Sequence, residues 1–156
     1  MQMKSFCIAC RGELSYLGES NGFEILKCGK CGLGRTVGRV EDDIEEYHRD
    51  QVYGVSKPQF SNIFQKRVDL AEKFLKTGKV LEVGSSIGLL LSQFKKRGWD
   101  VEGVEPSKTA YLLAQKEGIS THNTSFEEAN LRENFYDLVV LNHVLEHLEN
   151  PLKTLK

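Results

Sequence analysis

The most informative segment for the fold is Val80-Leu-Glu-Val-Gly-Ser-Ser-Ile-Gly-Leu-Leu-Leu91. It begins in a short apolar run that predicts a buried strand over 79–83, and it ends in an apolar helix predicted over 87–97. The loop between them contains Gly84 and Gly88, which let the backbone bend sharply and approach a ligand closely. The helix N-terminus supplies N–H groups for an anionic part of that ligand. The segment therefore predicts a ligand site at the carboxyl end of a strand.

Strands and helices alternate around this segment. Further strands are predicted at 101–104, weakly at 119–122 and strongly at 136–142, and further helices at 59–76, at 108–117 and from Asn150-Pro151 onward. Apolar strands of this length that alternate with helices predict a parallel sheet covered by helices on both faces, which is a Rossmann-like, doubly wound α/β fold.

The predicted sheet is incomplete, because the chain ends at Lys156 after about four strands. The strand at 136–142 is then expected at the edge of the sheet, where its unpaired backbone groups invite pairing with another chain. We expect self-association at this edge, or completion of the sheet by a C-terminal half.

Composition excludes several classes of protein. With 40% hydrophobic residues and 21 Lys and Arg against 22 Asp and Glu, the 156-residue chain is close to the averages for globular proteins, so disorder, collagen and coiled coil are disfavoured. No stretch approaches the roughly 18 apolar residues of a membrane span, and no apolar signal core follows Met1, so we expect a cytoplasmic protein without a membrane partner. A formal net charge of -1 does not indicate a nucleic-acid partner, which would need a local basic patch.

All four cysteines lie near the N-terminus, as Cys7, Cys10, Cys28 and Cys31. Their spacing, C-x2-C-x17-C-x2-C, falls in the range of four-thiolate zinc sites. The alternative is two disulfides or unrelated thiols, and a reducing cytosol disfavours disulfides. We expect a structural Zn²⁺, because four thiolates leave no coordination position for water or substrate.

Between the cysteine pairs, two strand-like stretches flank the turn signal Ser20-Asn21-Gly22, which is the pattern of a zinc ribbon. So small a module cannot bury enough apolar area to fold unaided, so metal binding and folding should be one event. We divide the chain into a zinc ribbon at 1–40, an acidic linker or helix at 41–58, and a partial Rossmann-like domain at 59–156. The alternative for the linker is a flap that carries Tyr47 or Tyr53.

An acidic residue follows the second predicted strand of the α/β part, at Glu105-Pro106, twenty-one residues after Gly84. A carboxylate at that place can accept both hydroxyl hydrogens of a ribose. A nicotinamide or flavin loop of the form G-x-G-x-x-G is excluded, since Ser86 and Leu89 occupy its second and third glycine positions. Loop and acid together predict a site for an adenosine-containing cofactor.

The segment from Val80 to Leu91 resembles the first motif of class I S-adenosylmethionine-dependent methyltransferases. Val101–Ser107 is similar to the second motif, and Asn134–Pro151 to the fourth strand of that family with its Leu-Glu-His and Asn-Pro ending. The resemblance spans roughly residues 60 to 156 and implies S-adenosylmethionine as cofactor. It implies methyl transfer to a small-molecule, sugar or RNA acceptor.

The resemblance also implies which residues form the site. The cofactor-binding positions are Glu82, Gly84, Ser85, Ser86, Gly88, Glu105, Pro106, Ser125, Phe126 and Asn142. Ser86 stands where the family has its central glycine, and Ser125 where it has an acid near the adenine. Glu82 has the alternative role of bracing the loop, and Phe126 that of a core residue.

His143 is the candidate general base, a group needed only if the acceptor must lose a proton. The alternative is a hydrogen-bonded loop histidine. Glu146 and His147 lie close by in sequence, and His143, Glu146 and His147 are similar to the metal set of small-RNA 2'-O-methyltransferases. A second metal ion is therefore a further hypothesis.

A second hypothesis assigns no turnover to the chain. The ribbon would be a module that binds RNA or protein, and the α/β part would bind cofactor without catalysis. The basic residues available to the ribbon are Lys27, Lys30, Arg35 and Arg39.

Overall fold

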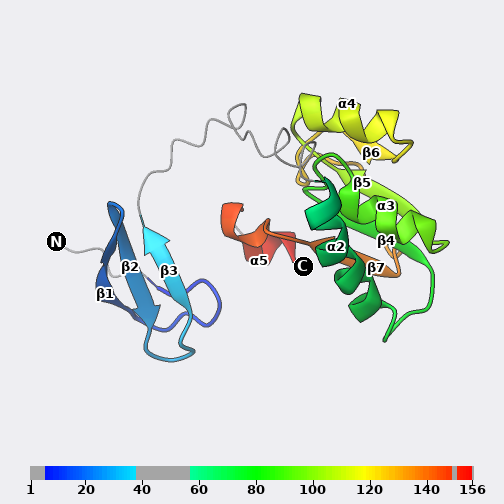
Figure 1. Ribbon diagram of the computed structural model, residues 1–156. Helices are drawn as coiled ribbons and strands as arrows, with labels where there is room; N and C mark the ends of the chain where they lie inside the picture. The colour runs from blue at the N-terminus through cyan, green and yellow to red at the C-terminus, as the bar shows by residue number, and fades with distance from the viewer. Residues whose placement is uncertain (1–5, 38–56, 149–150, 156) are drawn as a thin grey trace. The chain divides into compact units, whose positions relative to one another are not determined.

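The computed structural model describes residues 6–37, 57–148 and 151–155 (Figure 1). They form two compact units, an N-terminal one with three strands and a second one that contains every element from α2 onward. The predicted linker at 41–58, with its alternative of a tyrosine flap, lies outside the described residues except for Lys57 and Pro58, which begin α2.

The N-terminal unit is an antiparallel sheet in the order β1-β2-β3, with β1 at Leu14–Ser20, β2 at Phe23–Cys28 and β3 at Gly34–Val37. Asn21 and Gly22 join β1 and β2 with φ angles of 51° and 78°. Two left-handed residues are what a tight hairpin turn requires, so the predicted hairpin is confirmed. The strand β3 was not predicted, because its four residues are all exposed and show no apolar alternation.

The second unit contains a parallel sheet in the order β6-β5-β4-β7. Its strands are β4 at Lys79–Val83, β5 at Asp100–Val104, β6 at Thr121–His122 and β7 at Leu138–Leu141. The chain runs outward from β4 to β5 and β6, and then returns to place β7 on the other side of β4. The predicted α/β fold is confirmed, and β7 lies at an edge of the sheet in the described part of the chain, as expected.

The helices of this unit are α2 at Lys57–Ala71, α3 at Leu89–Lys96, α4 at Lys108–Lys116 and the short α5 at Pro151–Thr154. A 3₁₀ turn, η2, spans Leu145–His147. The helix α2 ends before the predicted residue 76, because Lys73 N and Phe74 N donate to carbonyls only three residues back and tighten the chain into turns. Ser107 caps α4 as expected, since its Oγ accepts a hydrogen bond from Ala110 N.

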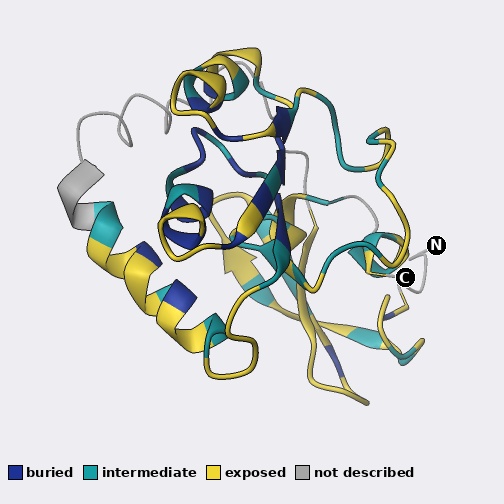
Figure 2. Cartoon of the chain, turned by 90° about the vertical axis from the view of Figure 1, so that its right-hand side faces the viewer, coloured by how far each residue is buried: buried dark blue, intermediate teal, exposed yellow. Residues whose placement is uncertain are grey.

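Two apolar clusters cover the two faces of this sheet. The cluster under the helices contains Phe64, Val68, Val80, Leu90, Leu91, Phe94, Trp99, Val101, Ala114 and Ile119. The other contains Leu81, Val83 and Val104, against which Phe126, Ala129, Leu131, Tyr136, Leu141 and Val144 pack. Figure 2 shows the buried residues gathered on the central strands and on the inner sides of the helices. Helices cover one face, and the other is covered by the coil after β6 rather than by a helix within residues 123–137.

Candidate functional site

The strand order of the α/β unit reverses between β4 and β7, and ligands of such sheets bind at the carboxyl ends of the strands flanking that point. Here the loop after β4 begins at Gly84, with φ at 68°. A Cβ atom on Gly84 would lie 2.6 Å from Cγ2 of Val144, which follows β7. Glycine is therefore required here both by backbone conformation and by close approach.

The loop contains two more left-handed residues, Ser86 with φ at 48° and Gly88 with φ at 77°. Gly88 is the N-cap of α3, and a Cβ there would lie 3.0 Å from Ile119. Ser86 adopts the conformation that favours glycine at the position where the resemblance expects glycine, at a cost of about 1 kcal/mol. The loop therefore keeps a glycine-like path despite the serine.

The acid after β5 meets this loop directly. Glu105 is buried, its Oε2 accepts a hydrogen bond from Ser86 N at 2.8 Å, and its Oε1 accepts one from Ser107 N at 2.8 Å. Gly84 N and Ser85 N also donate to the carbonyl of Val104 at the end of β5. The glycine loop and the carboxylate, which the sequence placed at one site, thus lie within hydrogen-bond distance of each other.

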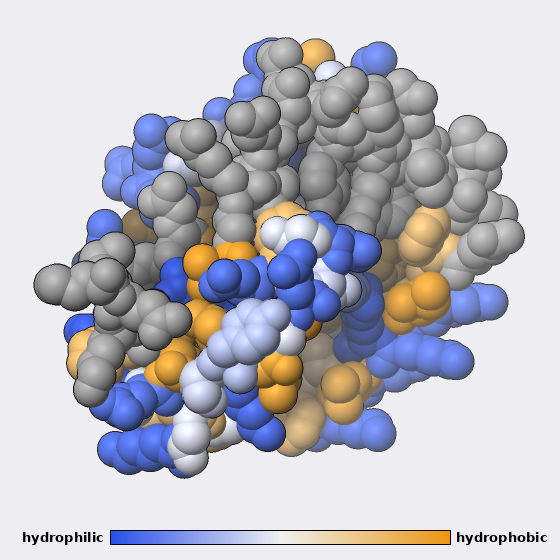
Figure 3. Space-filling model, turned by 90° about the vertical axis from the view of Figure 1, so that its left-hand side faces the viewer, coloured by the Kyte–Doolittle hydropathy of each residue, from blue (hydrophilic) through white to orange (hydrophobic). Residues whose placement is uncertain are grey.

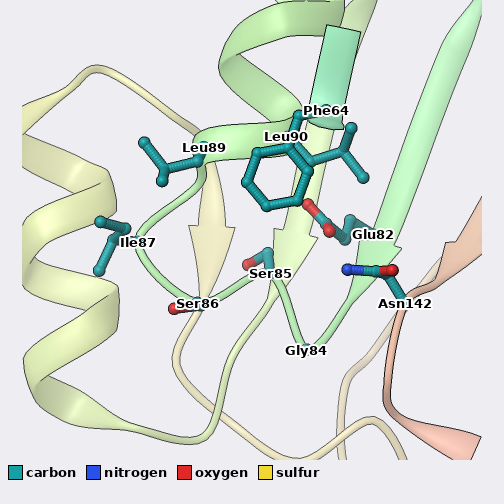
Figure 4. Close-up of a pocket in the computed structure, with 9 residues that line it drawn as sticks. All are labelled: Phe64, Glu82, Gly84, Ser85, Ser86, Ile87, Leu89, Leu90 and Asn142. Atoms are coloured by element: carbon teal, nitrogen blue, oxygen red, sulfur yellow. The ribbon is translucent and has the colours of Figure 1, made fainter. Parts of the chain in front are cut away.

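A pocket opens at the end of β4 (Figure 4). It is lined by Phe64, Glu82, Gly84, Ser85, Ser86, Ile87, Leu89, Leu90 and Asn142. Phe64 comes from α2 and was not singled out from the sequence, where it is one of several apolar residues at helical spacing. Ser85 Oγ is buried and has no hydrogen-bond partner within the described part of the chain. It lies 2.5 Å from where a Cβ of Gly103 would be, so Ser85 packs against β5.

Glu82 places a buried carboxylate in this pocket. Its Oε2 has no hydrogen-bond partner among the residues that the structure describes. Burial raises the pKa of Glu82 well above its ordinary value, the positive charge of Arg67 opposes this shift, and the charge of Glu105 adds to it. An unpartnered buried carboxyl oxygen is costly, and a cationic ligand group would satisfy it.

The two residues after β7 point in different directions. Asn142 lines the pocket, and Figure 4 shows its side chain on the side of Glu82. His143 has φ at 56°, its side chain is 63% exposed, and its Nδ1 lies 3.4 Å from Glu146 Oε1. His143 is therefore not among the residues that line the pocket. Residues 143, 146 and 147 do not form a metal-ligand cluster, since the four cysteines are the only such group in the described ranges.

Three further residues of the predicted cofactor site, Pro106, Ser125 and Phe126, lie apart from this pocket. Pro106 is exposed in the turn between β5 and α4. The carbonyl of Ser125 accepts a hydrogen bond from Ala129 N, and Phe126 packs against the second apolar cluster. None of these three residues lines the pocket at Glu82, and neither do Gly88 and Glu105.

The four cysteines of the ribbon converge. The sulfurs of Cys7, Cys10, Cys28 and Cys31 all lie within 4.8 Å of one another. Cys7 Sγ lies 3.6 Å from Cys31 Sγ, and Cys10 Sγ lies 3.5 Å from Cys28 Sγ. A cluster of four thiols of this size suits a tetrahedral zinc ion.

The two cysteine pairs sit in turns with the same hydrogen bonds. Cys7 N donates to Gly12 O and Arg11 N to Cys7 O, and in the second turn Cys28 N donates to Leu33 O and Gly32 N to Cys28 O. The left-handed residues of the two turns are Arg11, with φ at 60°, and Gly32, with φ at 76°. Arg11 is thus the counterpart of Gly32. Gly12 is required for another reason, because a Cβ there would lie 2.9 Å from Cys28 Sγ.

Backbone amides prepare the sulfurs for a cation. The amides of Cys31 and Lys30 lower the pKa of the Cys28 thiol to about 6, and the Cys10 amide lowers the pKa of Cys7. The Leu33 amide lowers the pKa of Cys31, but the sulfurs of Cys10 and Cys7 outweigh it and raise the pKa to about 12. Crowded thiolates thus retain a proton that a divalent ion would displace.

Comparison with known proteins identifies the α/β unit. A family model described as a methyltransferase domain matches residues 57–156. Among curated proteins, a Methanocaldococcus jannaschii protein named as uncharacterized is 27% identical over 94 residues, covering 60% of this chain and 44% of its own. A ubiquinone biosynthesis O-methyltransferase of Saccharophagus degradans is 30% identical over 105 residues, covering 63% and 42%. The chain thus spans less than half the length of these relatives.

Solved structures show the same fold. The plantazolicin methyltransferase BpumL in complex with SAH superposes with a TM-score of 0.59 at 18% identity, over 74% of this chain and 48% of its own. A Methanococcus maripaludis protein assigned as an S-adenosyl-L-methionine-dependent methyltransferase gives a TM-score of 0.63 at 15% identity, over 76% and 61%. In the described ranges, no helix has the length and apolar character to cross a membrane.

Proposed function

The chain belongs to the methyltransferase-domain family, and from this premise we propose that residues 57–156 are the S-adenosylmethionine-binding part of a methyltransferase. The acceptor is a small molecule, a sugar or RNA. The observation that carries the proposal is the hydrogen bond of 2.8 Å between Ser86 N and Glu105 Oε2, which joins the glycine loop to the acid at the carboxyl edge of the sheet.

The residues of the site fit the two ends of this cofactor. Glu105, followed by Pro106, is the candidate acid for the ribose hydroxyls, and Ser125 and Phe126 are the candidates for the adenine. Glu82 Oε2, which no described residue contacts by a hydrogen bond, suits the cationic ammonium of the methionine moiety. Gly84 and Gly88 let the loop pack closely against Val144 and Ile119, and the pocket lies beside Gly84, Ser85 and Ser86.

The bound cofactor would supply a methyl group on a positively charged sulfur. Methyl transfer is an in-line displacement, so the protein's contribution is to align the acceptor, hold the cofactor and exclude water. The aromatic ring of Phe64 and the amide of Asn142 close the pocket around Glu82. His143 is the first choice for a base where the acceptor must lose a proton, with Glu146 beside it.

Calorimetry with S-adenosylmethionine and S-adenosylhomocysteine tests the cofactor site. We expect micromolar binding by the wild-type chain and its loss in Glu105→Ala. The matched control is Glu133→Ala, which removes an exposed carboxylate from the coil after β6. An absence of heat at millimolar ligand, or equal affinity of wild type and Glu105→Ala, contradicts the proposal.

For the ribbon, we propose a structural zinc ion held by Cys7, Cys10, Cys28 and Cys31. Thiolates that bind a metal must stay reduced, which suits a cytoplasmic location. Metal analysis of the purified chain should give one zinc per chain, and a chain with Cys28→Ser should bind markedly less. A chain that purifies without zinc and does not bind added zinc contradicts this assignment.

The edge of β7 is the place where we propose that the sheet is extended, by a strand of a second copy or of a C-terminal half. Among the described strands, β7 pairs only with β4, and Val139 is 48% exposed. A chain that is monomeric at high concentration in sedimentation experiments excludes the second copy.

The second candidate function, a ribbon that binds RNA or protein, rests on one face of the N-terminal sheet. Tyr16 lies opposite Leu26, and Leu26 opposite Arg35, so an aromatic ring and a guanidinium share a face. The space-filling view in Figure 3 shows hydrophobic areas among hydrophilic ones, and Tyr16 and Leu17 are among the exposed large side chains. Salt-dependent RNA binding that survives Glu105→Ala and disappears on zinc chelation would favour this candidate.

A further inference from the structure

The turn after β5 is held from the side of β6 as well as from the glycine loop. Glu105 N donates to the carbonyl of His122 at 2.9 Å, which continues the pairing of β5 with β6. The next amide on that edge of β5 is Ser107 N, and it donates to Glu105 Oε1, so the pairing of backbone with backbone ends here. The side chain of Asn123 continues it, because its Nδ2 donates to the carbonyls of Glu105 and Pro106, both at 3.0 Å.

The orientation of the Asn123 amide follows from its partners. Both partners are carbonyl oxygens, so only the NH₂ end of the side chain can face them. The Glu105 backbone is thereby fixed from β6, while its carboxylate is fixed by Ser86 N and Ser107 N. Two segments far apart in sequence, at Ser86 and Asn123, thus act together with the nearby Ser107 on the position of this carboxylate.

We propose that Asn123 is a positioning residue, which holds the turn at Glu105 and Pro106 so that the Glu105 carboxylate meets the ribose of the cofactor. The inference rests on the proposed cofactor site. A carboxylate that accepts two adjacent hydroxyls must be placed within a few tenths of an ångström. Pro106 is exposed, so without the amide its carbonyl turns to water and the turn shifts.

The test uses Asn123→Asp, which keeps the size of the side chain but sets carboxylate oxygens against two carbonyl oxygens. The matched control is Asn130→Asp, the same change at an exposed asparagine in the coil after β6. Calorimetry measures the affinities for S-adenosylhomocysteine and for its 2′-deoxyribose counterpart. We expect the wild type to bind S-adenosylhomocysteine more tightly than its 2′-deoxyribose counterpart. The ratio of the two affinities should fall three- to tenfold in Asn123→Asp and stay unchanged in Asn130→Asp.

The outcomes separate the two proposals. If Asn123→Asp weakens both ligands equally, or neither, the amide does not position the ribose acid and this inference is wrong while the cofactor site stands. If the wild type fails to bind S-adenosylhomocysteine, the proposed function falls and the ribose role falls with it.

A second measurement needs no ligand. Hydrogen exchange of the Ser86 and Ser107 amides, followed by NMR, reports directly on their bonds to Glu105. We expect faster exchange at both amides in Asn123→Asp and unchanged exchange in Asn130→Asp. Unchanged protection in Asn123→Asp would overturn the positioning role whatever the cofactor does.

Discussion

The two units of this chain differ in the interactions that stabilise their folds. Within residues 6–37 only Cys7 and Cys28 are buried, and both belong to the sulfur cluster. The α/β unit instead buries two apolar clusters, one on each face of its sheet. We therefore expect the folding of the ribbon to depend on a metal ion and that of the α/β unit to depend on the hydrophobic effect. Removal of the metal should therefore leave the α/β unit folded, and a cavity in the apolar core should leave the ribbon folded.

The largest effect is expected from removing zinc. Binding of a structural zinc ion contributes about 10–16 kcal/mol to folding, far more than so small an apolar core can. Chelation should therefore unfold residues 6–37, and Cys28→Ser should do the same without chelator. In a two-dimensional NMR spectrum the ribbon signals should collapse while those of the α/β unit persist. Dispersed ribbon signals after verified metal removal would show that the ribbon has another source of stability.

The converse perturbation is a cavity in the α/β core. Phe94 is 1% exposed and packs edge-on against Trp99, with ring centroids 5.2 Å apart. Phe94→Ala should cost about 3–5 kcal/mol of the free energy of unfolding of the α/β unit and leave zinc affinity unchanged. The control, Phe74→Ala, removes a ring that is 81% exposed and should cost little.

Urea unfolding followed by Trp99 fluorescence measures this effect selectively, because Trp99 is the single tryptophan of the chain and lies in the α/β unit. Equal costs for Phe94→Ala and Phe74→Ala would mean that burial does not decide stability here. A loss of zinc in Phe94→Ala would mean that the two units are not independent.

The glycine loop is a place in the α/β unit where a single substitution is expected to be destabilising. Gly84→Ala meets both a φ of 68° and a contact of 2.6 Å with Val144, and should cost about 2 kcal/mol. Gly98→Ala is the matched control, since Gly98 has φ at 85° with open space around it. Adding Val144→Ala to Gly84→Ala should recover the part due to the contact. Equal unfolding midpoints for the variants at positions 84 and 98 would assign the whole cost to φ.

The sequence predicted what depends on local spacing and type. The four cysteines were found from their spacing, C-x2-C-x17-C-x2-C, and the glycine loop and Glu105 were found because each directly follows a predicted strand. The turn at Asn21 and Gly22 was found from its residue types. The α/β order followed from strands and helices that alternate along the chain.

Contacts between distant segments could not be predicted in the same way. Phe64 has the spacing of any core residue, and only the packing of α2 places it beside Glu82. Nothing in the sequence around Asn123 distinguishes it from other polar residues. Its role depends on the fold, which brings it within hydrogen-bond distance of the Pro106 carbonyl. Arg11 is the left-handed residue of the first cysteine turn although a glycine follows it, because Gly12 is required instead by the closeness of Cys28 Sγ from the other pair.

The smallest expected effect on stability comes from Glu102, a polar residue on the face of the sheet that the coil after β6 covers. Burial raises the pKa of Glu102, but hydrogen bonds from His122, Tyr136 and Lys79 outweigh it, so the net pKa is below the ordinary value. The Oε1 of Glu102 lies 2.6 Å from His122 Nε2, and its Oε2 lies 3.3 Å from Lys79 Nζ. A carboxylate with a lowered pKa stabilises the fold above its unfolded pKa and loses that contribution as the pH falls through the folded pKa.

Glu102→Gln should therefore cost about 1 kcal/mol at pH 7, and the difference from wild type should shrink as the pH falls below about 4. Urea midpoints by Trp99 fluorescence at several pH values measure this, with the exposed Glu133→Gln as control. A difference that stays constant with pH would assign the effect to packing rather than charge. Because zinc thiolates also protonate in acid, the ribbon is expected to unfold over the same range, and a tryptophan confined to the α/β unit separates the two events.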